Sequence, residues 1–267
     1  MDQPYLFAVD LDGTLLTGEK TISTKTKNAL LTAKKAGHKV VIATGRPFRA
    51  SEAYYQMLDL DTPIVNFNGA FVHHPLDRDW GVIHQPIPLD IAKTVIETCE
   101  AFRVKNIIVE VIDDVYLKTH DAFFIEAFGE GDPTFHTGNL GTLVKDDPTS
   151  IVVYPEEKSA TDLRELLSEA HAEVIEQRSW GAPYHLVEIV RGGVNKAVGL
   201  QRVAAALGIP RERVVAFGDE DNDMEMIAWA GRGVAMENAI EPLKAAADYV
   251  TGSNEEDGIA HYINRFL

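Results

Sequence analysis

Two carboxylates, Asp10 and Asp12, directly follow the apolar run Leu6–Val9 near the start of the chain. A short apolar run that ends at a turn residue, here Gly13, predicts a buried strand of a parallel sheet. Because side chains alternate along a strand, we expect both aspartates on one side, near the carboxyl end where open α/β sheets build their sites. Carboxylates this close repel each other unless a cation or a shared proton compensates. The pair therefore predicts a cation site, with a solvated acidic turn as the alternative.

A second acidic cluster, Gly218–Asp223 (GDEDND), follows another apolar run at 213–217. We expect it at the same edge of the sheet as the first pair, because the carboxyl ends of parallel strands share one edge. Several oxygen ligands at one edge suit a hard cation such as Mg²⁺, which takes carboxylates, waters and a substrate phosphate. The alternative is a helix N-terminus whose acidic side chains satisfy the helix dipole.

An anion site is predicted by Lys196, Thr44 and Gly45. Lys196 stands after the good N-cap residue Asn195, at a helix end where the dipole disfavours a positive charge. A lysine held there suggests a partner anion such as phosphate, although a solvated lysine is the plainer interpretation. Thr44 and Gly45 follow the apolar run at 39–43, and they offer a hydroxyl and a backbone N–H to an anion. Taken alone, Thr44 and Gly45 are more typical of an ordinary strand-to-helix turn.

The elements that must position these residues fall into two sets. Strand and helix patterns alternate over 1–83 and again over 191–267, which is typical of a doubly wound parallel α/β sheet. Between them, a helix followed by two strands occurs twice, which indicates an inserted α+β domain at 84–190. We expect the acidic residues Glu100, Glu110, Asp113 and Asp114 on a solvated face of this inserted domain.

Bulk properties exclude several classes of protein. The 267 residues carry 25 basic and 41 acidic side chains, a net charge of −16, which argues against nucleic-acid binding through phosphates. No apolar run approaches the roughly 20 residues of a membrane helix. The first residues, MDQPYLF, lack a signal segment, and Cys99 has no cysteine partner. We expect a cytoplasmic protein that is a monomer or a weak homo-oligomer.

The order of the motifs is similar to that of one family. DLDGT at 10–14, TGR at 44–46, Lys196 and GDEDND at 218–223 resemble the four motifs of the haloacid dehalogenase superfamily. The inserted α+β domain, together with NGA at 68–70, resembles the Cof-type group with a type-IIB cap. The resemblance implies a Rossmann-like core with a C2B cap, and a Mg²⁺-dependent phosphatase of small phosphomonoesters.

The resemblance also implies roles for single residues. Asp10 would be the nucleophile that forms an aspartyl-phosphate, and Asp12 would act as acid and then as base, in surroundings that raise its pKa. Mg²⁺ would be held by the Asp10 carboxylate, the Asp12 carbonyl and Asp219, with Asp223 supporting the site from behind. Arg46 would lie at the cap boundary and reach the substrate. The phosphoryl oxygens would be held by Thr44, Lys196, Asn222 and the N–H groups of Leu11 and Gly45.

The substrate stays open at this point. Members of the family act on sugar phosphates, pyridoxal phosphate, FMN or the riboflavin precursor 5-amino-6-(5-phosphoribitylamino)uracil, and the residues do not distinguish among them. A phosphomutase, which shares the aspartyl-phosphate step, and a non-catalytic sensor of a phosphorylated metabolite are the alternatives. In each case the expected partner is a small phosphorylated metabolite, with neither nucleic acid nor membrane.

Overall fold

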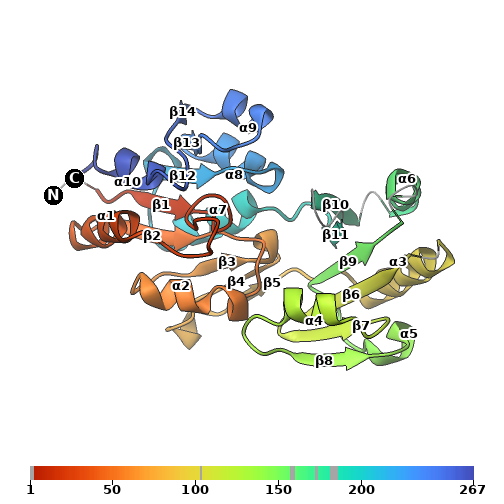
Figure 1. Ribbon diagram of the computed structural model, residues 1–267. Helices are drawn as coiled ribbons and strands as arrows, with labels where there is room; N and C mark the ends of the chain where they lie inside the picture. Colours follow the sequence, from red (N-terminus) through yellow and green to blue (C-terminus); the bar gives the residue numbers. More distant parts are fainter. Residues whose placement is uncertain (1–2, 103, 157–159, 172–173, 181–185) are drawn as a thin grey trace. The chain divides into compact units, whose positions relative to one another are not determined.

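The computed structural model describes residues 3–102, 104–156, 160–171, 174–180 and 186–267 (Figure 1). The chain divides into two compact units. Unit 1 comprises Met1–Arg46, Ser51–Ile83 and Asn195–Leu267, and unit 2 comprises Pro47–Ala50 and His84–Val194. The sequence pattern contains no sign of the short excursion into unit 2 at Pro47–Ala50.

Among the described residues, unit 1 is built on a parallel five-stranded sheet with the order β14–β13–β12–β1–β2. Val9 pairs with Phe217 of β12 on one side and with Ile42 of β2 on the other, so these three neighbouring strands end at nearly the same level. This register places Asp10 beside the residues that follow the neighbouring strands. The strands are β1 (Leu6–Val9), β2 (Lys39–Ile42), β12 (Val214–Gly218), β13 (Arg232–Ala235) and β14 (Tyr249–Val250).

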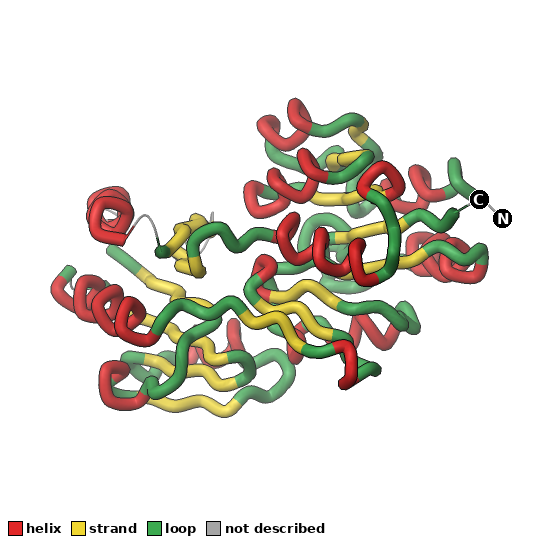
Figure 2. The backbone as a smooth tube through the Cα atoms, turned by 180° about the vertical axis from the view of Figure 1, so that it is seen from behind, coloured by secondary structure: helices red, strands yellow, loops and turns green. Residues whose placement is uncertain are grey.

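Helices cover both faces of this sheet, as expected for a chain in which strands and helices alternate (Figures 1 and 2). Leu6 and Ala8 lie in an apolar cluster with Leu200 of α7. Phe7 faces the other way, with its ring centroid 5.5 Å from that of Phe266, which follows α10. The helices of unit 1 are α1 (Thr24–Lys35), α2 (Glu52–Met57), α7 (Lys196–Ala206), α8 (Met224–Trp229), α9 (Glu241–Ala246) and α10 (Gly258–Ile263).

The apolar run at 63–67 (PIVNF) differs from the parallel strand that the alternating pattern of 1–83 predicts for it. Strand β3 (Ile64–Asn66) joins a separate sheet in the order β3–β4–β5, with β4 (Phe71–His73) antiparallel to it and β5 at Val82–His84. Its link to the main sheet is the isolated parallel bridge between Ala43 and Val65. The reason is local, because a left-handed turn directly after Asn66 reverses the chain.

In its described part, unit 2 contains a six-stranded sheet with the order β10–β11–β9–β6–β7–β8, antiparallel except for the β7–β8 pair. The first of the two predicted strand pairs is a hairpin, which closes where Val111 pairs with Asp114. Helices α3 (Leu89–Ala101), α5 (Leu140–Leu143) and α6 (Ala160–His171) pack on one face, and α4 (Ala122–Phe128) packs on the other. The strands are β6 (Asn106–Val111), β7 (Asp114–Leu117), β8 (Thr134–Thr137), β9 (Ser150–Tyr154), β10 (Ile175–Trp180) and β11 (Leu186–Arg191).

Glu110 does not lie on a solvated face, so that expectation is wrong. The side chain is buried, and its Oε1 accepts a hydrogen bond of 2.6 Å from Nη2 of Arg49. Its Oε2 accepts from the Ser150 hydroxyl, and Nη1 of Arg49 donates to the carbonyl of Ile112. Arg49 belongs to the excursion Pro47–Ala50, so this buried ion pair holds the excursion within unit 2. Burial raises the pKa of Glu110, and the charge of Arg49 opposes that rise.

Cys99 lies buried within α3 as a free thiol. Burial raises the pKa of this thiol to about 12, which keeps it protonated and a poor nucleophile at neutral pH. No helix in the described ranges is long and apolar enough to cross a bilayer.

Candidate active site

A buried ion pair links the end of β1 to the start of α7. Nζ of Lys196 donates to Oδ1 of Asp10 at 2.6 Å and to Oδ1 of Asp223 at 2.7 Å. Asn195 caps the helix, because its side chain accepts from the N–H of Val198. Lys196 is fully buried, so it is not the solvated lysine of the plainer interpretation. The positive end of the helix dipole and burial both disfavour the charged lysine. The two carboxylates outweigh these effects and raise the pKa of Lys196.

Asp223 connects this lysine to the turn after β12. Its Oδ2 accepts the backbone N–H groups of Asp219 and Glu220 at 3.0 and 3.2 Å. The bond from Glu220 is part of a capping box around the short 3₁₀ helix at Asp221–Asp223. The capping interpretation of the acidic cluster is therefore correct for Asp223, which holds Lys196 with its other oxygen.

Asp219 is positioned by the turn that follows Asp12. The hydroxyl of Thr14 donates to Oδ1 of Asp219 at 2.7 Å. Gly13 has a φ of +75°, and a Cβ atom built on it would lie 2.1 Å from Oδ2 of Asp219. Only glycine satisfies both the left-handed backbone and this close approach. The sequence DGT thus places Asp219, although the sequence analysis assigned Thr14 no role.

The ligand atoms of Asp10, Asp219 and Asp223 all lie within 4.8 Å of one another. Burial and the charges of the neighbouring aspartates raise the pKa of Asp10, against the influence of Lys196. Burial and the charge of Asp223 raise the pKa of Asp219 to about 7. Three carboxylates therefore share one ammonium group, and the surplus negative charge fits a divalent cation with oxygen ligands.

Asp12 differs from what the sequence analysis expects. Nε and Nη2 of Arg46 donate to its two carboxylate oxygens at 2.7 and 2.8 Å, and Lys20 donates at 2.6 Å. Burial favours the protonated acid, but the hydrogen bonds and charges of Arg46 and Lys20 prevail and lower the pKa of Asp12 to about 2. The expectation of a raised pKa is wrong for this arrangement. No pattern in the sequence indicates Lys20, whose contact depends on a loop conformation.

The remaining predicted residues surround the same cluster in unit 1. Thr44 is buried after β2, and its hydroxyl accepts the N–H of Arg46 at 3.1 Å. The side chain of Leu11 is also buried, one residue after Asp10. Asn222 lies in the 3₁₀ helix after Asp219, and its Nδ2 donates to Oδ1 of Asn68 at 2.9 Å. Asn68, part of the NGA motif, was not among the predicted site residues.

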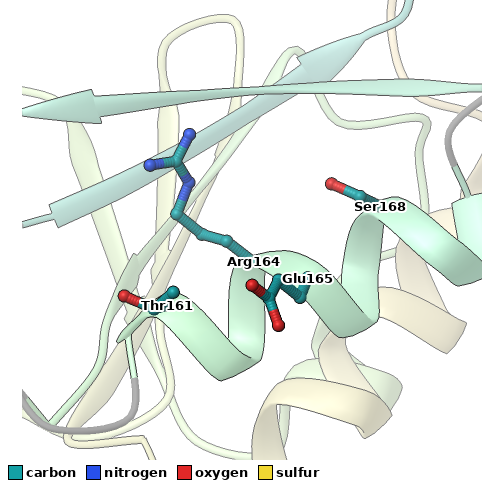
Figure 3. A pocket seen from close by; sticks show the side chains of 4 residues that line it. All are labelled: Thr161, Arg164, Glu165 and Ser168. Atoms are coloured by element: carbon teal, nitrogen blue, oxygen red, sulfur yellow. The ribbon is translucent and has the colours of Figure 1, made fainter.

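A surface pocket elsewhere contains none of these residues. It lies along α6 in unit 2 and is lined by Thr161, Arg164, Glu165 and Ser168 (Figure 3). These side chains are exposed, and they lack the convergent buried charges of the cluster around Lys196.

Comparison with known proteins agrees with this geometry. The haloacid dehalogenase-like hydrolase family matches residues 7–263. The chain belongs to the haloacid dehalogenase superfamily. A Bacillus subtilis 5-amino-6-(5-phospho-D-ribitylamino)uracil phosphatase is 49% identical over 99% of this chain and 98% of its own length. An Escherichia coli pyridoxal phosphate phosphatase is 32% identical over 98% of both chains.

The fold of this haloacid dehalogenase superfamily member also has solved counterparts. The structure of a sugar phosphatase of subclass IIB matches with a TM-score of 0.81 and 27% identity, and it covers 99% of both chains. These likenesses place the chain in the Cof-type group and identify it as a phosphatase.

Changing Gly13 to alanine is expected to displace Asp219 directly, because the new methyl carbon would lie 2.1 Å from Oδ2 and collide with it. A displacement of about 1 Å at a reacting centre can cost on the order of 10²-fold in rate. We expect a loss of that size in kcat in a steady-state phosphatase assay.

Gly37 provides the matched control for this substitution. It has a φ of +94°, and a Cβ atom there would meet nothing within 4 Å. Gly37→Ala therefore imposes a similar backbone strain without the collision. Equal losses in the two variants would show that strain, and not the displacement of Asp219, causes the effect.

Proposed function

We propose that this phosphatase hydrolyses 5-amino-6-(5-phospho-D-ribitylamino)uracil through a phosphoenzyme formed on Asp10. The chemistry rests on one observation, the buried cluster in which Lys196 holds Asp10 and Asp223 beside Asp219. The substrate assignment is supported by the 49% identity to the Bacillus subtilis enzyme over nearly all of both chains.

In the first step, a carboxylate oxygen of Asp10 attacks phosphorus while the bond to the ribityl oxygen breaks. Lys196 fixes the orientation of the attacking carboxylate with its 2.6 Å hydrogen bond. The hydroxyl of Thr44, the amide of Asn222 and the N–H groups of Leu11 and Gly45 hold the phosphoryl oxygens. Positioned donors of this kind stabilise the charge on the transferring group.

Asp12 moves the protons. It gives a proton to the leaving alcohol, and it takes one from the water that then attacks phosphorus and releases Asp10. The pairing of Asp12 with Arg46 and Lys20 favours the carboxylate, which is the form that accepts a proton. The acid step therefore requires a looser contact with Arg46, whose guanidinium would turn toward the substrate.

The carboxylates of Asp10 and Asp219 would hold Mg²⁺ with the backbone carbonyl of Asp12, and Asp223 would support them through Lys196 and the capping box. When bound, the ion supplies positive charge next to the phosphoryl oxygens. The surplus of carboxylates over ammonium groups in the cluster supports this assignment.

We assign residues 1–83 and 191–267 to a catalytic core and 84–190 to a cap that selects the leaving group. We also propose that the protein is cytoplasmic, that it is a monomer or a weak homo-oligomer, and that its substrate is a small metabolite. Pyridoxal phosphate is the second candidate substrate, because the Escherichia coli relative with that name is 32% identical over 98% of this chain.

A substrate panel tests this proposal. The purified protein is assayed with Mg²⁺ on the riboflavin precursor, pyridoxal phosphate, FMN, a hexose phosphate and p-nitrophenyl phosphate. We expect kcat/KM for the riboflavin precursor to exceed that for each other metabolite by at least about tenfold. A preference for pyridoxal phosphate would transfer the assignment to the second candidate. Full activity in EDTA would contradict the metal assignment.

A further inference from the structure

A strained turn follows β3 inside unit 1. Phe67, Asn68 and Gly69 have φ values of +48°, +53° and +99°, three left-handed residues in succession. A left-handed conformation is unfavourable for a non-glycine residue, and such strain persists only where the surroundings enforce it. Asn68 is 1% exposed, so this polar side chain is buried within the turn. Strained residues are enriched at functional sites, and the contacts of this turn lead to the groups that it holds in place.

The turn first holds the loop that carries Thr44. The N–H of Asn68 donates to the carbonyl of Thr44 at 3.0 Å, and the N–H of Phe67 donates to that of Arg46 at 3.2 Å. The amide of Asn68 packs against Gly45, where an added Cβ would lie 3.2 Å from its Nδ2. Both ends of the Thr44–Arg46 loop are therefore fixed by consecutive residues of the turn.

The same turn reaches the two other elements of the site. Oδ1 of Asn68 accepts the hydrogen bond from Nδ2 of Asn222. Gly69 packs so closely on the residue before Lys196 that an added Cβ would lie 2.2 Å from the carbonyl oxygen of Asn195. Three segments that are distant in sequence thus meet at one turn.

We infer that the turn Phe67–Gly69 aligns the phosphate-holding groups, and that Asn68 is a positioning residue that acts through Asn222. The inference rests on the proposed phosphatase function and assigns a role to a residue outside the catalytic set. Because Asn68 accepts one N–H of the Asn222 amide, that amide is held in one orientation. The same nitrogen carries a second N–H, which can donate a hydrogen bond to a phosphoryl oxygen.

The variant Asn68→Gly tests the inference, because glycine keeps the left-handed backbone and removes only the side chain. With p-nitrophenyl phosphate we expect kcat/KM to fall by about 10- to 100-fold and competitive inhibition by inorganic phosphate to weaken. Asp59→Gly is the matched control, since Asp59 is an exposed left-handed residue of the same unit with a φ of +48°. It should keep wild-type activity and phosphate inhibition.

A double-mutant cycle separates positioning from a general structural role. If Asn68 acts through Asn222, then Asn68→Gly should cost little further activity in an Asn222→Ala background. Losses that multiply, or a wild-type value for Asn68→Gly, would overturn the inference and leave the phosphatase assignment intact. A wild-type protein without phosphatase activity would instead overturn the proposed function and this inference with it.

A measurement on the wild type covers the case in which Asn68→Gly does not fold. In NMR spectra of a ¹⁵N-labelled sample, the side-chain amide signals of Asn222 are assigned as those that are absent from the spectrum of Asn222→Ala. Titration with inorganic phosphate in the presence of Mg²⁺ should shift these signals and those of Asn68 together. A shift at neither residue would overturn the inference.

Discussion

Replacing Asp10 by asparagine is expected to lower kcat by a factor on the order of 10⁴ or more without destabilising the fold. The activity falls because the amide is a poor nucleophile toward phosphorus. The fold persists because Asp10 is one of three carboxylates around a single ammonium group, so that its neutralisation relieves repulsion while Asp223 keeps the hydrogen bond to Lys196. Steady-state kinetics and thermal unfolding of the same preparation measure the two effects.

Asp61→Asn is the matched control for this substitution. Asp61 is exposed and lies 3.4 Å from Lys39 at the surface, so its neutralisation should leave both rate and stability near wild type. An Asp10→Asn variant that retains a tenth of the activity would contradict the role of Asp10 as nucleophile. A folded but much less stable variant would contradict the account of charge crowding.

Replacing Lys196 by methionine is expected to have the largest effect on stability. The substitution leaves Asp10, Asp219 and Asp223 buried without their counter-charge, and loss of one partner of a buried pair costs about 3–5 kcal/mol. The loss should be smaller at pH 5 than at pH 8, because the crowded carboxylates can take up protons in place of the lysine's charge. Denaturant unfolding at the two pH values gives the free energy of unfolding directly.

Lys244→Met is the control for the lysine variant, since Lys244 pairs at 3.0 Å with the largely exposed Glu241. Pairs of that kind contribute about 0–1 kcal/mol. If the two lysine variants lose similar stability at pH 8, then the buried cluster is not organised around Lys196. In that case the orientation of Asp10 would need another cause.

The sequence predicts the centre of this site well because its signals are local. The apolar runs before Asp10 and Asp219 specify adjacent parallel strands, and the register then brings the two carboxylates to one edge. Lys196 follows a helix cap, so its position at the first residue of α7 is also specified locally. The central strands of the five-stranded sheet and the acidic cluster at their ends follow from such patterns.

Contacts that depend on distant loops do not follow from those patterns. The pairing of Asp12 with Arg46 and Lys20 reverses the expected direction of its pKa, and it requires three loop conformations at once. The burial of Glu110 similarly depends on Arg49, 61 residues earlier in the chain. Each contact joins side chains that are distant in the sequence, and neither side chain's own sequence neighbourhood indicates its partner.

The placement of β3 was missed for a related reason. An apolar run at 63–67 resembles the other central strands, but the left-handed residues Phe67 and Asn68 turn the chain back after three strand residues. Phenylalanine rarely adopts this conformation, so the sequence contains no turn signal before Asn68. The strain is visible only in the folded chain, where the turn holds the loop of Thr44.

The most direct test of the account is to trap the phosphoenzyme and locate the phosphate. Asp12→Asn should slow hydrolysis of the intermediate, while p-nitrophenyl phosphate, whose leaving group needs no proton, still loads it. After acid quenching and reduction with borohydride, peptide mass spectrometry should find homoserine in place of Asp10. Phosphate on another residue, or a burst of p-nitrophenol with Asp10 unmodified, would contradict the role of Asp10 as the nucleophile.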